Sequence, residues 1–366
     1  MKIGINATFL NENPTGVGVY TKETSSRIHK LNRETFVFSS VPCNPIGPQY
    51  LVKTPTTIRG SLHLLNNLLR FLYINTLLPL KVTNRGIDVL LCPIAEFPFF
   101  QVPQVITIHD LHPIYFPQQF GLSSRYFRLS LKMLPRIPGR IVVPSFFVKS
   151  ELLKVAPIDS SIVDVIPNGY NSELFKPQKI EMRDGFMTRY GLKKPYILFV
   201  GSLFPYKNVK TLIETFMGIK NQISHSLVVV GNKRLSTEPL AEDKRILYMD
   251  YIPLEDIPKF YSYADMLVHP SLAEGFGMTV LEAMACGTPV ISSRNGSLPE
   301  VVGEAGILFD PYGNSLEQAM LALIRNKDLR NDLIEKGLRN VTRYSWDTTA
   351  ERILQSCKKA FQKKLA

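Results

Sequence analysis

A repeating alternation of short apolar runs and helical segments constrains the fold of this chain more than any other feature. In the first half, the runs that we expect to form strands are residues 2–6, 36–40, 88–92, 105–108, 140–144 and 162–166. The second half repeats the alternation at residues 196–200, 227–230, 246–249, 266–269 and 290–292. Strands that alternate with helices are typical of parallel sheets covered by helices on both faces. The sequence therefore predicts two doubly wound α/β domains.

An irregular polar stretch, residues 168–194, separates the two series of strands. A chain of 366 residues is longer than one ordinary α/β core needs and is suited to two. We place the first domain at residues 1–172, the second at 173–345, and a C-terminal helix at 346–366 that packs back toward the first domain. The apolar stripe of that helix is Ile353, Leu354, Cys357 and Phe361. If the sheets face each other, the carboxyl ends of both sets of strands line one cleft, where such sheets bind ligands.

Charge and cysteine content narrow the partners and the compartment. The net charge is +12, and 17 Lys and Arg against 9 Asp and Glu place two-thirds of the excess in residues 1–172. Such an excess attracts nucleic acid, anionic lipid or phosphorylated ligands. The four cysteines form no closely spaced pair, which argues against a disulfide framework or structural zinc. No leader of signal-peptide length precedes the first strand, and no run of about 18 apolar residues occurs, so we expect a cytoplasmic protein.

The most informative segment is LAEGFGMTVLEAMACGTPVISS, residues 272–293. It predicts a strand end, a turn containing Gly275 and Gly277, and a helix that ends near Gly287, just before Pro289. Glycines at the entry let the backbone approach a ligand closely. The free N–H groups at the start of the helix then favour an anion, ideally a diphosphate.

Two carboxylates bracket this turn. Glu274 lies in it, and Glu282 follows eight residues, or about two helical turns, later, so both side chains can project to one side. Carboxylates next to a diphosphate suit the hydroxyls of a sugar and a ribose rather than the phosphates themselves. Taken alone, a glycine pair with two solvated glutamates would be an ordinary strand–helix turn, since such matches often arise by chance.

The string EGFGMTVLEAMACGTPV resembles, nearly residue for residue, the signature of retaining glycosyltransferases of family 4. That family has the GT-B fold, two Rossmann-like domains around a central cleft. The resemblance implies that Glu274 contacts sugar hydroxyls and that Glu282 holds the nucleotide ribose. It also implies that the backbone of Phe276, Gly277 and Met278 meets the sugar and phosphates of the donor.

A second segment, FVGSLFPYKNVKTLIETF at residues 199–216, is a strand, a glycine turn and a helix. Lys207 is similar to the family lysine that neutralises the donor diphosphate, and a cation there helps the leaving nucleotide depart. Many members of the family carry an arginine where this chain has Ser202 or Tyr206. Phosphate neutralisation would then rest on Lys207 and the helix terminus, with Ser202 lining the donor site.

Other segments resemble parts of the family's first domain. Gly16 and Gly18 are expected in the loop after the first strand, beside donor phosphate and acceptor. His109 and Asp110 follow a strand directly, and the resemblance places His109 against the donor hexose as a catalytic residue with Glu274 and Lys207. Asp110 is equally suited to capping the next turn. Ser145, Lys149 and Asn168, the last followed by Gly169, are expected to support the acceptor side of the cleft and the hinge.

The resemblance implies a retaining, metal-independent hexosyltransferase without a cofactor. No D-x-D and no histidine cluster at metal spacing occurs in the sequence, which agrees with a metal-free site. The best match is to mannosyltransferases of cell-surface polysaccharide synthesis. We therefore expect GDP-mannose as donor and a glycan or lipid-linked oligosaccharide as acceptor. A UDP-hexose-dependent enzyme and a non-catalytic relative that binds a nucleotide sugar are the alternatives.

Four basic residues at helical spacing lie between residues 123 and 140: Arg125, Arg128, Lys132 and Arg136. They form either a solvated face or a dock for anionic lipid or a lipid-diphosphate acceptor on the inner face of a membrane. Residues 61–80 are too polar to span a bilayer, and we expect them to pack in the core rather than face a membrane.

Rival classes lack their own signals. A nicotinamide-dependent enzyme needs three glycines after the first strand and an acidic residue ending the second, and neither is present. A sugar-nucleotide epimerase shares the two-domain architecture but not the helix bearing both glutamates. Nucleic acid would explain the net charge, but no recognisable binding motif supports it.

Overall fold

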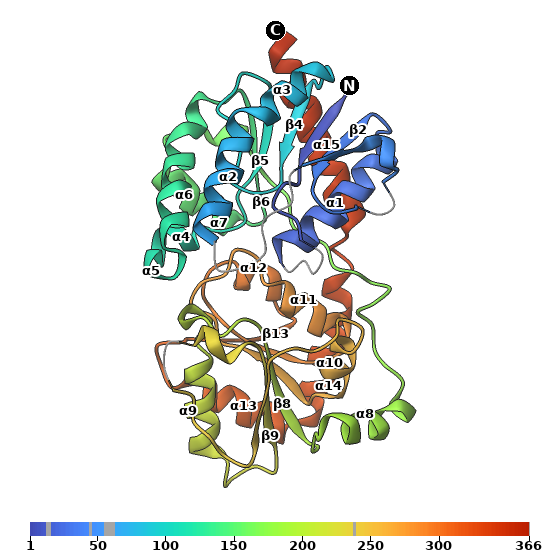
Figure 1. Ribbon diagram of the computed structural model, residues 1–366. Coiled ribbons are helices and arrows are strands. Elements are labelled where there is room, and N and C mark those ends of the chain that lie inside the picture. The colour runs from blue at the N-terminus through green and yellow to red at the C-terminus, as the bar shows by residue number, and fades with distance from the viewer. Residues whose placement is uncertain (12–15, 44–45, 55–62, 237–238, 366) are drawn as a thin grey trace. The chain divides into compact units, whose positions relative to one another are not determined.

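The computed structural model describes residues 1–11, 16–43, 46–54, 63–236 and 239–365 (Figure 1). They form two compact units, Met1–Gly169 together with Ser345–Ala366, and Tyr170–Tyr344. The division falls just before the boundary that we placed after residue 172. In the described part of the chain, no helix is both long and apolar enough to cross a membrane. All four cysteines are buried and free.

The first unit is built on a seven-stranded parallel sheet in the order β3-β2-β1-β4-β5-β6-β7. Its strands are β1 (Ile3–Asn6), β2 (Thr35–Ser39), β3 (Leu51–Lys53), β4 (Val89–Cys92), β5 (Gln104–Thr107), β6 (Gly139–Val143) and β7 (Val163–Val165). Six of them confirm the sequence prediction to within a residue or two. The edge strand β3 was not predicted.

The helices of the first unit follow the strands in the expected alternation. They are α1 (Val17–Leu31), α2 (His63–Asn75), α3 (Leu77–Asn84), α4 (His112–Tyr115), α5 (Pro117–Phe120), α6 (Leu122–Met133), α7 (Phe146–Val155) and α15 (Trp346–Leu365). Single 3-10 turns occur at Pro48–Tyr50, Leu134–Arg136 and Ser160–Ile162. One apolar cluster fills the space between α2, α3, α6, α7 and the sheet.

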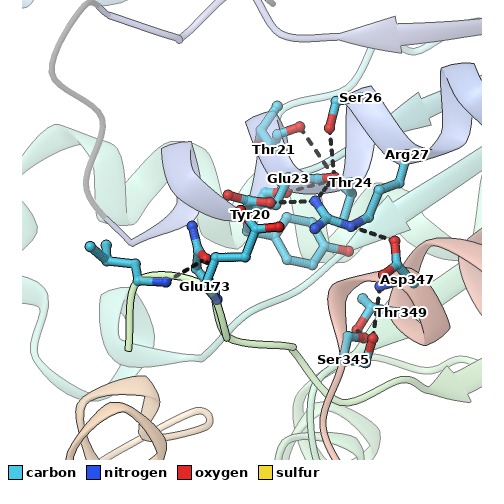
Figure 2. Close-up of polar contacts among 12 residues, drawn as sticks. Tyr20, Thr21, Glu23, Thr24, Ser26, Arg27, Glu173, Ser345, Asp347 and Thr349 are labelled. Carbon is cyan, nitrogen blue, oxygen red and sulfur yellow. Dashed lines mark hydrogen bonds and ion pairs between the residues drawn. The ribbon is translucent and has the colours of Figure 1, made fainter. Parts of the chain in front are cut away.

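The last helix, α15, returns to the first unit and lies beside α1, the red and dark blue helices of Figure 1, across β4, β5 and β6. Three residues of its predicted stripe are buried, Ile353, Leu354 and Cys357, and the fourth, Phe361, is half-buried. The guanidinium of Arg27 on α1 donates to Asp347 at 2.8 Å and also pairs with Glu23 (Figure 2). The tail is therefore part of the first core.

Close backbone approach fixes where α15 begins. A Cβ on Gly169 would lie 2.1 Å from the backbone nitrogen of Trp346, so only glycine fits there. The hydroxyl of Thr349 donates to the Pro167 carbonyl at 2.8 Å. The C-terminal end of the segment Met1–Gly169 and the start of α15 are thus held together.

The second unit is built on a six-stranded parallel sheet in the order β10-β9-β8-β11-β12-β13. Its strands are β8 (Tyr196–Val200), β9 (Ser226–Val230), β10 (Ile246–Met249), β11 (Met266–His269), β12 (Val290–Ser293) and β13 (Gly306–Phe309). The first five confirm the prediction, and the edge strand β13 was not predicted.

Helices cover both faces of the second sheet. They are α8 (Arg183–Tyr190), α9 (Val209–Ile219), α10 (Ile257–Tyr263), α11 (Met278–Ala285), α12 (Leu298–Val302), α13 (Ser315–Arg325) and α14 (Lys327–Val341). Successive residues of β8 enter different clusters: Tyr196 and Leu198 pack with α10 and α11, whereas Ile197 and Phe199 pack with α9 and α13. This two-sided burial explains why the parallel strands are continuously apolar.

The stretch after the first unit is more ordered than predicted. The sequence analysis read residues 168–194 as irregular, but they contain a 3-10 turn at Ile180–Met182 and helix α8. Phe186 and Met187 of α8 are buried in the second core, and Gly191 closes the helix in the left-handed region at φ 62°. The polar residues Asp184, Thr188 and Arg189 of this short helix are exposed.

Candidate functional site

The glycine turn before α11 has the predicted shape. Gly277 precedes the helix with φ 101°, a conformation that L side chains rarely adopt, and a Cβ there would lie 2.8 Å from Leu298. The Phe276 side chain is buried and packs edge-on against Tyr344, with ring centroids 5.7 Å apart. A ligand at this turn would therefore meet the backbone of Phe276 and Gly277 and the first turn of α11, which starts at Met278.

Two of the predicted donor residues contact each other directly. The Nζ of Lys207 forms an ion pair with the carboxylate of Glu274. Lys207 ends a 3-10 turn, Pro205–Lys207, and Asn208 follows in the left-handed region at φ 55°. The carbonyl of Tyr206 accepts the N–H of Leu272 at 2.7 Å, which fastens this turn to the glycine turn. The fold thus brings together two side chains that are 67 positions apart in the sequence.

Two further donors complete the surroundings of Glu274. The Nε2 of His269 donates to its Oε1 at 2.7 Å, and the hydroxyl of Ser271 donates at 2.9 Å. The other ring nitrogen of His269 lies 3.3 Å from the hydroxyl of Thr279 on α11. His269 was missed by the sequence analysis, which read it only as a strand end. Its position, five residues before Glu274 at the carboxyl end of β11, is the signal that could have found it.

These partners set the charge of Glu274. Its side chain is 9% exposed, and burial alone would raise the pKa of its carboxyl group. The Lys207 ammonium and the His269 hydrogen bond outweigh burial and hold that pKa well below its ordinary value. Glu274 is therefore an ionised acceptor throughout the physiological range.

Glu282 has a different environment. It lies on α11, and its carboxylate accepts the hydroxyl of Tyr261 at 3.2 Å. Burial raises its pKa to about 7, and the Tyr261 hydrogen bond only partly offsets that effect. Within the described residues, the side chains of Glu274 and Glu282 have different hydrogen-bond partners. Glu274 is therefore a permanent anion, whereas Glu282 titrates near neutrality.

Ser202 follows β8 in a close backbone crossing. Its neighbour Gly201 approaches Gly231 so closely that a Cβ on Gly231 would lie 2.0 Å from the Gly201 oxygen. Ser202 itself is half-buried. It lies at the same carboxyl edge of the sheet as Lys207 and the glycine turn, since all three follow parallel neighbours β8 and β11.

In the first unit, His109 is held from two sides. Its Nε2 lies 2.8 Å from the Pro93 carbonyl, and its ring stacks edge-on against Tyr20 at 4.5 Å. Burial lowers the pKa of His109, against the opposing effect of the Pro93 carbonyl. Tyr20 in turn contacts Thr107 through its hydroxyl and the ring of Trp346 at 5.9 Å. His109 is therefore a neutral, oriented ring.

Several predicted supports have local roles in the first unit. Asp110 accepts the N–H of His112 at 2.9 Å, which is the capping alternative. Ser145 caps α7 by accepting the Val148 N–H at 3.1 Å. The Nζ of Lys149 donates to the carbonyls of Ser160 and Val163.

The remaining first-unit predictions need one correction. Gly16 precedes α1 with φ 44°, as a loop residue should, but Gly18 is not in the loop: it lies buried in the first turn of α1. Its lack of a side chain suggested a loop, whereas the helix already starts at Val17. Asn168 is buried next to Gly169 at the end of this pass of the chain. Residues 12–15 of the predicted loop lie outside the described residues.

A pocket of about 590 Å³ lies at the carboxyl edge of the first sheet. It is bordered by Val17 after β1, by Ile94 and Glu96 after β4, and by His109 after β5. The strand order reverses between β1 and β4, and open α/β sheets bind ligands at such a switch point. Side chains of α2 and α6 form the outer wall.

The predicted basic face is exposed. Arg125, Arg128, Lys132 and Arg136 all reach solvent, while Leu131 between them is buried. Residues 61–80 were predicted to pack in the core, but helices α2 and α3 are only partly buried. Their buried residues include Ile74 and Leu78, but four leucines are between 46% and 60% exposed: Leu69, Leu72, Leu77 and Leu80.

Comparison with known families identifies the chain. The description "Glycosyltransferase Family 4" matches residues 14–174, and "Glycosyl transferases group 1" matches residues 186–340. This chain is a family 4 glycosyltransferase. The O-antigen chain mannosyltransferase B of Escherichia coli is 27% identical over 281 residues, 71% of this chain and 73% of that protein. The O-antigen chain mannosyltransferase RfbU of Salmonella typhimurium is 28% identical over 68% of each chain.

Solved structures show the same fold. Sucrose-phosphate synthase from Thermosynechococcus elongatus superposes with a TM-score of 0.76 at 20% identity over 99% of both chains. Anabaena Alr3699/HepE in complex with UDP-glucose gives 0.76 at 16% identity over 98% of this chain and all of that one. With its two parallel-sheet units, this glycosyltransferase has the GT-B fold.

In this glycosyltransferase, Lys207, Glu274 and Glu282 all belong to the second unit. Within the described residues, no three His, Cys, Asp or Glu side chains gather as a metal site would require. The polar groups at and beside this turn include the ammonium of Lys207 and the carboxylates of Glu274 and Glu282.

Proposed function

We propose that this glycosyltransferase transfers mannose from GDP-mannose, with retention and without a metal ion, to a glycan or lipid-linked oligosaccharide used in cell-surface polysaccharide synthesis. The O-antigen mannosyltransferases among its relatives support the sugar. The observation that carries the proposal is the cluster of Lys207 and Glu274 beside the start of α11. It offers a cation, an acceptor and the start of a helix within one compact unit.

Each donor group has a chemical counterpart in that cluster. Lys207 and the first N–H groups of α11 would bind the diphosphate, because both favour an anion. Glu274 would accept hydroxyls of the sugar, and Glu282 those of the ribose. His109 in the first unit would face the hexose, in keeping with its neutral, oriented ring.

The reaction that follows is a displacement on one face of the sugar. The bond between the anomeric carbon and the phosphate oxygen breaks, and the acceptor oxygen bonds to that carbon on the same face. The acceptor proton passes to an oxygen of the departing diphosphate. Lys207 stabilises the charge that develops on the leaving group, so no side chain needs to act as the base.

The alternative donor is a UDP-hexose. One solved structure of the same fold holds UDP-glucose. The residues of the cluster recognise phosphates, ribose and hexose, which both donors share. The nucleobase therefore has to be determined by experiment.

The first experiment is thermal melting of the full chain with millimolar GDP, UDP, ADP and dTDP, each with EDTA. A ligand at ~100 times its Kd adds roughly 2.7 kcal/mol of stability. We expect selective stabilisation by GDP despite EDTA. Stabilisation by UDP alone would replace mannose with a UDP-linked hexose. If none of the four stabilises the chain, the donor site is wrong and a non-catalytic role becomes the better description.

We also propose that the face formed by Arg125, Arg128, Lys132 and Arg136 holds the enzyme on an anionic membrane surface near a lipid-linked acceptor. Each cation near such a surface contributes about 1 kcal/mol. Changing all four to Glu should abolish co-sedimentation with phosphatidylglycerol vesicles and leave nucleotide stabilisation intact. Equal sedimentation of the variant would assign these residues to an ordinary solvated face.

A further inference from the structure

The pocket of the first unit combines aromatic walls with one ion pair. Phe71 on α2 and Tyr126 on α6 contact each other edge-on, with ring centroids 5.5 Å apart, and Phe120 and Phe127 add two more rings to the lining. Aromatic rings present flat apolar surfaces that exclude water. At 590 Å³ the pocket has the size of a small-molecule site.

The polar groups of the pocket carry little net positive charge. Arg70 donates to Glu96 at 2.8 Å, and both side chains stay about one-fifth exposed. Among the described residues that line the pocket, Arg70 is the only Lys or Arg, and Asp110 adds a second carboxylate. Burial raises the pKa of Glu96, and Arg70 only partly counters this. The ring of His109 is neutral, since burial lowers its pKa.

This charge pattern differs from that of the donor cluster. A phosphate placed here would meet two carboxylates and a guanidinium that is already paired. Like charges brought together in a binding site cost several kcal/mol. Among the described basic residues of the first half, Arg125, Arg128 and Lys132 on the exposed face of α6 do not line this pocket.

Resting on the proposed transferase function, we infer that this pocket binds the acceptor through an uncharged sugar ring and rejects phosphorylated sugars. The aromatic rings would cover the apolar face of the sugar. Glu96 would accept one sugar hydroxyl, and the exposed part of Arg70 would donate to another. The pocket opens where β1, β4 and β5 end, which is the ligand edge of the sheet.

The test uses the full chain and three probes: p-nitrophenyl α-mannoside, mannose 6-phosphate and n-dodecanol, with binding followed by calorimetry or ligand-observed NMR. We expect the mannoside to bind at least about tenfold tighter than the phosphate. Equal or tighter binding of the phosphate would overturn the inference. Dodecanol binding that displaces the mannoside would assign the pocket to a hydrocarbon chain and also overturn it.

Two variants locate the binding. Ser123 is exposed on the pocket rim, so Ser123→Trp should fill the opening and reduce mannoside binding at least about tenfold. Gln118→Trp, an equally exposed position on α5 that does not line the pocket, is the matched control. Unchanged binding in Ser123→Trp would place the sugar elsewhere.

A third variant tests the charge argument. Glu96→Gln removes one carboxylate and its ion pair with Arg70, so it should narrow or reverse the preference for the mannoside over the phosphate. A merely structural role of Glu96 would weaken both probes equally, and that result would refute the argument. Nucleotide stabilisation without mannoside binding would overturn this inference alone. Mannoside binding without nucleotide stabilisation would overturn the proposed transferase reaction instead.

Discussion

Replacing Glu282 with Gln should make the protein more stable than wild type at alkaline pH and should weaken its binding of nucleotide. In the folded chain, burial raises the pKa of this carboxyl group from 4.5 to about 7. The unfolded chain loses the proton near pH 4.5, so the folded state holds it more tightly. The stabilisation that the protonated Glu282 contributes is fully present below pH 4.5 and is lost as the pH rises through about 7.

The size of the effect follows from the two pKa values. Each pKa unit corresponds to about 1.4 kcal/mol, so ionising Glu282 in the folded state costs on the order of 3 kcal/mol. The Glu282→Gln variant avoids that cost, and its side-chain oxygen still accepts the hydroxyl of Tyr261. Its buried NH₂ group, however, needs new hydrogen-bond acceptors, which offsets part of the gain. The melting temperature of Glu282→Gln relative to wild type should rise by roughly 5–10 °C between pH 5 and pH 8.

The assay is thermal melting at pH 5, 6, 7 and 8, without and with nucleotide. Glu335→Gln is the control, because it removes the same charge from an exposed position in the same unit. Nucleotide affinity of wild type should increase from pH 6 to pH 8, since the ionised carboxylate accepts ribose hydroxyls, and the variant should show no such increase. A melting difference that stays constant with pH would mean that the pKa of Glu282 is not raised to about 7, and the reasoning would fail.

Two further predictions concern positions that the sequence did not single out for these roles. His269→Leu removes a donor from the buried Glu274 and should cost about 1.5–3 kcal/mol of stability. It should also reduce the preference for nucleotide sugar over free nucleotide. The control His225→Leu breaks a similar buried contact with Asp265 and should destabilise the protein without changing that preference. If both variants show the same preference, His269 has no role in donor binding. Gly169→Ala places a Cβ against the backbone of Trp346 and should lower stability by several kcal/mol, measurable by urea unfolding. A change below about 0.5 kcal/mol would show that the two segments separate freely.

Much of the fold was predictable because buried parallel strands carry strong local patterns. Most residues of the predicted strands are apolar, and strands such as β9 and β11 are fully buried between helices on the two faces of the sheet. The two missed strands are edge elements with weak patterns. β3 has three residues and ends in the exposed Lys53, and β13 begins with Gly306 and is only partly buried. The edge strands β7 and β10 were predicted, so the weak local patterns of β3 and β13, rather than their edge position, explain why both were missed.

The site was predictable only where its residues are close in sequence. The string around Gly277 fixed the turn, the helix and both glutamates. The ion pair of Glu274 with Lys207 depends on how the turns after β8 and β11 meet, and the pair of Arg70 with Glu96 depends on how α2 lies over β4. Such contacts join separate elements, and periodicity within one element contains no information about them.

The ion pair between Lys207 and Glu274 has a consequence for the reaction cycle under the proposed function. Both groups are needed for different parts of the donor, yet without donor they neutralise each other. An incoming nucleotide sugar offers its diphosphate to Lys207 and its hydroxyls to Glu274, so both charges exchange one partner for another. The product nucleotide offers only the diphosphate, and it draws Lys207 away while leaving Glu274 with His269 and Ser271 alone. Because an undercompensated buried carboxylate is costly, the site should hold the intact donor more tightly than the product, which favours product release after transfer.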